Sequence, residues 1–146
     1  MSKQRSIILE SPDATVGIAL DGEIQLAQLK LQSSSFELNV FLNVFDVKSL
    51  NVSELPLAPD QTAICAGESC GAPAHWSRGP EDFMAIVIGF DDTNWDFGVF
   101  MPYSEFDKIK NLLLSLVPTL ELQSDDNQRL HPSGDQEFWK IHASYR

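Results

Sequence analysis

A period-two alternation of apolar and polar side chains runs through the first third of this 146-residue chain, and that period is typical of an extended strand. It is clearest between residues 36 and 45, where one face of the predicted strand carries Phe36, Leu38, Val40, Leu42 and Val44. The other face carries Phe41 and Phe45 among polar residues. These two phenylalanines either pack beneath a helix or a second sheet layer, or belong to an exposed apolar patch that marks a partner site.

Three more extended segments are predicted before residue 36. Residues 6–11 form the first of them, and residues 16–20 and 24–31 flank Asp21–Gly22, a dipeptide that strongly favours a tight hairpin. The apolar phase slips by one residue near Ala27–Gln28, which predicts a bulge or a bend. With the strand above, these segments predict a four-stranded N-terminal meander.

The middle of the chain changes character twice. Residues 51–80 contain seven proline and glycine residues, which predict a long irregular loop. The uninterrupted apolar run at residues 84–90 then predicts a central strand covered on both faces. A turn at residues 91–94 leads to its partner strand at residues 96–101.

One helix is predicted to begin at Ser104, with Asp107 completing a capping box, and to end at Pro118. Its apolar positions follow helical spacing, and these are Phe106, Ile109, Leu112, Leu113, Leu116 and Val117. Its polar side faces water and carries Lys108, Lys110 and Asn111. A polar loop over about 123–134 and a last strand at residues 137–144 follow.

These segments predict one globular α+β domain spanning residues 1–146. The expected architecture is a mostly antiparallel sheet of about six or seven strands, beginning with the N-terminal meander. A single helix from the C-terminal half packs on this sheet.

The negative charge is concentrated in one part of the sequence. Between Lys48 and Lys108 lie ten acidic residues, and Arg78 is the only base, whereas the whole chain carries a net charge of −11. Such a field repels nucleic acid and anionic membranes and attracts basic surfaces. We therefore expect a basic protein partner, and we expect binding neither to nucleic acid nor to a membrane.

The sequence also bears on localisation and on cofactors. No window approaches the ~18 apolar residues of a membrane helix, and no signal-peptide stretch follows the start, so a cytoplasmic protein is predicted. Loops for phosphate or dinucleotide binding and the common hydrolase signatures do not occur in the sequence. No cofactor is expected.

The most reactive residue types cluster as Cys65, Cys70 and His75. Thiolates and imidazole are zinc ligands, but the spacing is wider than in most structural zinc sites and a fourth ligand is missing nearby. A cysteine nucleophile with a histidine base is the neighbouring possibility. Plain loop residues explain the same three positions, so the metal or thiol site is only a weak alternative.

A small acidic chain without a catalytic signature is typical of an immunity protein or antitoxin that neutralises a toxin, such as a nuclease, by direct binding. The acids would surround a few aromatic anchors. The predicted partner-binding residues are Glu81, Asp82, Asp91, Asp92, Trp95, Asp96, Glu105 and Asp107. The alternatives are a dimeric secretion or folding chaperone with an exposed apolar face at Phe41 and Phe45, and a thiol- or metal-dependent enzyme.

Overall fold

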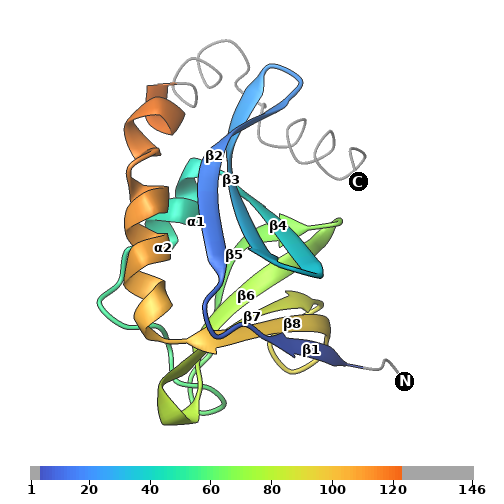
Figure 1. Cartoon of the computed structure of the whole chain (residues 1–146). Coiled ribbons are helices and arrows are strands. Elements are labelled where there is room, and N and C mark those ends of the chain that lie inside the picture. Colours follow the sequence, from blue (N-terminus) through green and yellow to red (C-terminus); the bar gives the residue numbers. More distant parts are fainter. Residues whose placement is uncertain (1–3, 123–146) are drawn as a thin grey trace.

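The computed structural model describes residues 4–122 as an α+β fold dominated by one strongly curled, eight-stranded sheet (Figure 1). The prediction of an α+β class is confirmed, whereas six or seven strands was an underestimate. The strands are β1 (Arg5–Ile8), β2 (Asp13–Asp21), β3 (Ile24–Ser33), β4 (Phe36–Leu42), β5 (Ile64–Ser69), β6 (Ala72–Arg78), β7 (Phe83–Gly89) and β8 (Trp95–Pro102).

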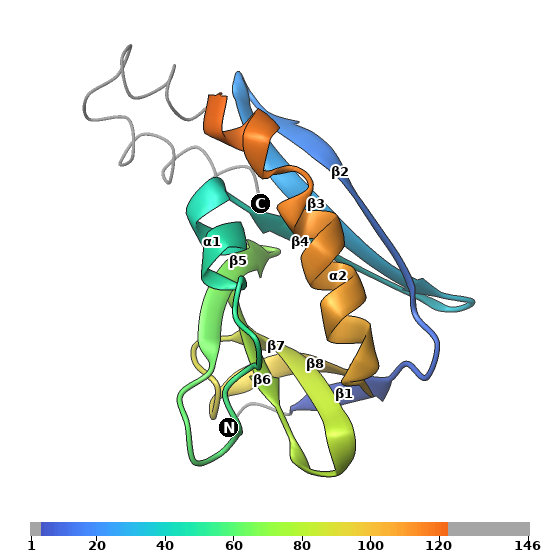
Figure 2. The ribbon, with the colours of Figure 1, turned by 90° about the vertical axis from the view of Figure 1, so that its left-hand side faces the viewer.

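Helices fill the concave side of this sheet (Figure 2). They are the short α1 (Val44–Ser49) and the longer α2 (Ser104–Leu114), and a 3-10 turn η1 (Pro80–Asp82) joins β6 to β7. A further helical segment covers residues 117–122. None of the helices in the described range is long and apolar enough to cross a membrane.

The strand order is β1-β8-β7-β6-β5-β4-β3-β2, and it corrects the predicted N-terminal meander. β1 does not join β2 but lies parallel to β8, with Ile7 opposite Val99. Only β2, β3 and β4 form the meander, and the sheet is mixed because of this parallel edge. The pairing of β1 with β8 joins two segments about ninety residues apart in the chain. Local sequence patterns do not predict a contact between such distant segments.

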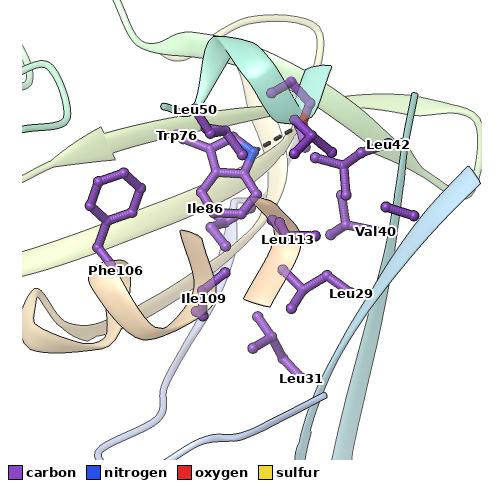
Figure 3. Packing of buried hydrophobic residues seen from close by; sticks show 14 of the residues in the cluster. Leu29, Leu31, Val40, Leu42, Leu50, Trp76, Ile86, Phe106, Ile109 and Leu113 are labelled. Atoms are coloured by element: carbon purple, nitrogen blue, oxygen red, sulfur yellow. Dashed lines mark hydrogen bonds between the residues drawn. The ribbon is translucent and has the colours of Figure 1, made fainter. Parts of the chain in front are cut away.

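The core lies on the concave face and is centred on Trp76, whose side chain is fully buried (Figure 3). Its indole Nε1 donates a hydrogen bond to the Ala66 carbonyl oxygen at 2.9 Å, which satisfies the only polar atom of this large ring. Three buried residues of α2 complete the core on the side facing the sheet, and these are Phe106, Ile109 and Leu113.

The curl of the sheet brings distant strands into contact. Phe36 at the start of β4 stacks on Phe97 of β8 with ring centroids 5.3 Å apart, although three strands separate β4 from β8. β4 and β5 themselves share a single register pair, Phe41 opposite Glu68. The β4–β5 joint is therefore the least regular pairing within the described sheet.

Gly67 makes this joint possible. β5 has an irregular register between Cys65 and Glu68, and Gly67 there adopts a left-handed φ of 81°. A Cβ atom on Gly67 would lie 2.8 Å from the carbonyl oxygen of Phe41 and 2.8 Å from Cγ of Leu42. Only glycine therefore fits between the two strands.

The predicted bulge near Ala27–Gln28 is wrong. β2 and β3 pair without interruption from Asp13 opposite Gln32 to Asp21 opposite Ile24. The apolar phase appears to slip because Leu26 and Leu29 lie on opposite faces of β3 and both side chains are buried.

The predicted strand at 36–45 ends early, at Leu42. Asn43 starts α1 with a capping box: its Oδ1 accepts from Asp46 N at 2.8 Å, and Asp46 Oδ2 accepts from Asn43 N at 3.0 Å. Val44 is therefore helical and buried, and Phe45 is helical and 58% exposed. Phe41 and Phe45 consequently do not share a strand face.

The predicted irregular loop over 51–80 contains two strands, β5 and β6. They join through Cys70 and Gly71, which have φ values of 52° and 82°, as a tight hairpin turn with two left-handed residues requires. The remaining part, residues 51–63, is irregular, and its Leu57 forms an isolated bridge with Arg78.

The central hairpin and the long helix match the sequence closely. β7, the turn after it and β8 are confirmed, as is a helix beginning at Ser104. The N-cap, however, is Tyr103 without a side-chain bond, and α2 ends at Leu114 before the helical segment that contains Pro118. The predicted loop at 123–134 and strand at 137–144 lie outside the described residues.

Lys110 is a further correction, because this side chain does not face water. Its Nζ donates to the Val52 carbonyl oxygen at 2.9 Å and lies 5.2 Å from the centroid of the Phe106 ring. The lysine thus ties α2 to the segment that follows α1.

Replacing Gly67 by alanine should destabilise the fold by about 3 kcal/mol, because the new Cβ meets backbone and core atoms in a left-handed conformation. Gly17→Ala is the matched control, since nothing lies within 4 Å of a Cβ there. The control should change the free energy of unfolding by no more than about 1 kcal/mol. Urea unfolding measures both, and equal effects would contradict the tight β4–β5 joint.

Candidate protein-binding surface

The convex face of the sheet carries an aromatic cluster that neither α1 nor α2 covers. Along β8, Val99 and Met101 point into the concave core, so the alternate residues Asp96, Gly98 and Phe100 point to the convex face. Ile8 of β1 is paired with Phe100 and lies on the same face. The fold thus places apolar side chains on the outer side of β1 and β8.

Trp95 completes this cluster because of an irregularity in β8. The register shifts between Ile88 and Gly89, which opposes Trp95. The indole then folds back over Gly98, where a Cβ would lie 3.1 Å from the ring, and it tilts against Phe100 at a centroid distance of 6.3 Å. Because residue 98 has no side chain, the Trp95 indole can pack over the backbone there.

The side chains of this cluster are too exposed to form a second hydrophobic core. Ile8 is 63% exposed and Phe90, in the turn after β7, is 80% exposed, whereas Trp95 and Phe100 are half-buried. Large aromatic side chains with a free face are the usual anchors of protein interfaces. We define the convex patch as Ile8, Trp95, Asp96 and Phe100, and the exposed Phe90 belongs to the turn between β7 and β8.

The turn beside the convex patch is held by two aspartates. Asp91 Oδ1 accepts from the backbone N–H of Thr93 at 2.9 Å, from the Thr93 hydroxyl at 2.9 Å and from Asn94 N at 2.7 Å. These bonds, led by that from the Thr93 backbone, lower the pKa of the Asp91 carboxyl. Asp92 Oδ2 accepts from Ala63 N at 3.1 Å and fixes the turn to the loop before β5.

The other predicted partner-binding acids lie at the opposite end of β7 and β8. Glu81 and Asp82 occupy η1, and the Asp82 carbonyl oxygen accepts from Tyr103 N at 2.7 Å, next to the start of α2. Glu105 and Asp107 follow there, paired with Lys108 at 3.2 Å and Lys110 at 3.4 Å. At about 3.3 Å per strand residue, β8 separates this group from Asp91 by roughly 20 Å.

The structure therefore divides the eight predicted residues into two groups. Asp91, Asp92, Trp95 and Asp96 come together, and Glu81, Asp82, Glu105 and Asp107 form a separate group. Ile8, Phe90 and Phe100 were missed by the sequence prediction. The alternation of Asp96, Gly98 and Phe100 against the core-facing residues of β8 was the available signal for Phe100, whereas the pairing that brings Ile8 there is not local.

Arg78, the single base between Lys48 and Lys108, connects β6 to the irregular segment 51–63 through its backbone. Its backbone N–H donates to the Pro56 carbonyl oxygen, and its own carbonyl oxygen accepts from Ala58 N, each at 2.8 Å. The guanidinium lies 5.6 Å from the Tyr103 ring centroid and 3.9 Å from Glu54. It lines an open depression of about 640 Å³, whose walls also come from the segment 52–57 and from Gln61, Thr62 and Ile64.

Cys65, Cys70 and His75 do not form a site in this structure. Cys65 opposes His75 across β5 and β6, but His75 Nε2 lies 3.1 Å from the Gly89 carbonyl oxygen, and Cys70 lies in the hairpin turn. Burial, with Asp46 and Glu68, raises the pKa of the Cys65 thiol. Within residues 4–122, no group of three histidine, cysteine or acidic side chains is arranged to hold a metal ion.

The Asp91 turn predicts a specific acid titration. A lowered carboxyl pKa contributes to stability above the unfolded value of about 3.9, and this contribution is lost as the pH falls through the lowered pKa. NMR should show the amide protons of Thr93 and Asn94 titrating with one midpoint below about 3.9. In Asp91→Asn the titration should vanish while the turn persists, because the amide oxygen still accepts. A midpoint above that value would contradict the geometry of the turn.

Cys65 should react slowly at neutral pH. In a Cys70→Ser variant, the iodoacetamide rate should reach half its maximum above about pH 8.5, since burial opposes the thiolate. A raised thiol pKa means that the folded state retains a proton that the unfolded chain loses, so stability falls as the pH rises past about 8.5. A half-maximum below pH 7 would instead identify an activated nucleophile.

Comparisons with protein-family models, curated proteins and solved structures find no match for this chain. The convex patch, the turn beside it and the acidic group at the far end of β8 are the features on which a function must be argued.

Proposed function

We propose that this protein binds a basic protein surface through the convex patch and acts as an immunity protein or antitoxin that neutralises a toxin by direct contact. The observation that carries the proposal is the juxtaposition of Trp95 and Phe100 with the carboxylate of Asp96 on the convex face, next to a turn in which Phe90 is exposed. An aromatic centre with an acidic rim suits a cationic partner, because arginine and lysine can stack on the rings and pair with the carboxylates.

The charge of the folded part supports this choice of partner. Residues 4–122 contain 17 acidic and six basic side chains, so they carry a net charge of −11. A field of this sign accelerates encounter with a basic surface and disfavours acidic ones. The rings of Trp95 and Phe100 would then provide the short-range contact that charge alone does not give.

Rigidity of the turn also favours binding. The Asp91 hydrogen bonds and the Asp92 contact with Ala63 hold the turn, and Gln4 Nε2 donates to the Thr93 carbonyl oxygen at 3.2 Å. Phe90 is thus presented from a fixed backbone, and little conformational entropy needs to be lost when a partner binds.

The enzyme alternative receives less support. A cysteine nucleophile needs an activated thiolate beside a base, whereas burial raises the pKa of the Cys65 thiol, Cys70 lies in the hairpin turn, and His75 Nε2 lies 3.1 Å from the Gly89 carbonyl oxygen. The chaperone alternative relies on an apolar face at Phe41 and Phe45, but these residues belong to β4 and α1 and only Phe45 is exposed. The convex patch instead brings Ile8, Trp95 and Phe100 onto one face.

The proposal predicts a salt-sensitive complex with a basic toxin domain, the natural candidate being the product of an adjacent gene. Asp96→Lys should lower the association rate about tenfold at low salt, because it reverses a charge beside the contact surface. It should change the free energy of unfolding by less than about 0.5 kcal/mol, because the residue is exposed. Stopped-flow binding and urea unfolding measure the two effects.

Glu81→Lys is the matched control, since it alters the net charge equally at the far end of β7. It should reduce the association rate clearly less than Asp96→Lys does. Equal reductions would show that only the overall field matters, and binding that is indifferent to salt would contradict the proposal. Trp95→Ala should accelerate dissociation, because it removes an anchor while the field stays unchanged.

A further inference from the structure

β2 forms the edge of the sheet opposite to β1, and its own residues lack the features that usually protect an edge strand. It pairs with β3 alone among the described strands, over nine consecutive residue pairs without a bulge. Residues 13–21 include no lysine, arginine or proline, the residues that commonly block strand addition. A straight edge of this length is suited to accept another strand.

The register shows which backbone groups β2 offers. Gly22 and Glu23 form a two-residue turn, so the flanking pair Asp21 and Ile24 is a hydrogen-bonded pair. Pairs then alternate along the hairpin, and the even-numbered residues of β2 direct their N–H and C=O groups away from β3. These residues are Ala14, Val16, Ile18 and Leu20.

Apolar side chains accompany this edge. Val16 packs against the core, whereas Ile18 is 38% exposed and Leu20 is 63% exposed on the same concave-facing row. A strand added beside β2 would bring its own alternate side chains next to Ile18 and Leu20 and would cover them.

Charge indicates what kind of strand fits. The edge is uncharged between its ends, but exposed carboxylates flank it: Glu10 and Asp13 at one end and Glu23 at the other. A second copy of β2 pairing antiparallel would bring exposed carboxylates such as Asp13 and Glu23 of the two copies toward each other, which like-charge repulsion disfavours. A strand with basic residues at both ends is complementary.

We infer that the outer edge of β2, which no other strand of residues 4–122 occupies, is a strand-addition site for an extended segment of another protein, with alternating apolar residues and a lysine or arginine at each end. The outer edge of β2 and the strand β8 lie far apart in the strand order, with six strands between them counting β2 itself, although Glu10 is only two residues from Ile8 in the chain. The inference stands independently of the proposed function.

The test uses the full chain and a nine-residue peptide, Lys-Val-Thr-Val-Thr-Ile-Thr-Val-Lys, as the probe. Titration should give saturable binding, and hydrogen exchange should slow at the amides of Val16 and Ile18. A peptide with glutamate at both ends should bind about tenfold more weakly or not at all. Absence of saturable binding, or equal binding of the acidic peptide, would overturn the inference.

Two variants separate backbone pairing from side-chain contact. Ile18→Pro removes an outward N–H while leaving the bonds to β3, and it should weaken peptide binding about tenfold. Ile18→Ala keeps the N–H and should weaken binding clearly less. Equal losses would show that backbone pairing is not the mode of binding.

The free protein supplies the remaining check. The outward amides of β2 should exchange rapidly before peptide is added, and sedimentation should show the same monomer for the wild type and for Ile18→Pro. Slow exchange of these amides in the free protein, or a dimer that Ile18→Pro dissociates, would mean that the edge is already occupied and would overturn the inference.

Discussion

The joint between β4 and β5 determines the shape of this protein. Two sheet segments meet there through one register pair, Phe41 with Glu68, and Gly67 lets their backbones approach closely. The hydrogen bond from the Trp76 indole to the Ala66 carbonyl oxygen fixes the adjacent irregularity from the core side. A regular ladder at this position would extend the sheet instead of bending it, and Phe36 would not reach Phe97.

The curl gives the two faces of the sheet different roles. The concave face closes around Trp76 and α2, and it takes nearly all of the large apolar side chains. The convex face carries the side chains of β1 and β8 that do not point into the core. Trp95 and Phe100 are large aromatic residues among them. Because Gly98 makes room for the indole, Trp95 packs over residue 98 and stays half-buried on the convex face, an arrangement that core packing does not require.

Sequence reasoning succeeded where one local signal dominated. The apolar run of β7, its turn and the helical spacing of α2 are of this kind, and each prediction was accurate to about one or two residues at its start. It failed where two signals competed. Val44 and Phe45 continue the alternation of β4, but the Asn43 and Asp46 capping box starts a helix. Gly67, Gly71 and Pro73 resemble loop residues, although they serve a bulge and a tight turn within a hairpin.

The candidate site was predictable only in part, for a physical reason. Asp91, Asp92, Trp95 and Asp96 are neighbours in sequence, so their association in space needed no knowledge of the fold. Ile8 joins them through the parallel pairing of β1 with β8, which arises from global topology. The role of Gly98 was not predictable from local sequence either, because it depends on the Trp95 ring, which folds back over residue 98.

The separation of the acidic residues into two groups changes what the net charge means. Electrostatic screening has a length of about 8 Å at physiological salt, and the two groups lie roughly 20 Å apart along β8. Each group would therefore act on a partner of the proposed kind almost independently, and the group around Glu105 and Asp107 is partly neutralised by Lys108 and Lys110. In the proposed complex, only the acids beside Trp95 and Phe100 would combine charge with the exclusion of water, so affinity would depend on that local combination and the total of −11 would mainly influence the rate of encounter.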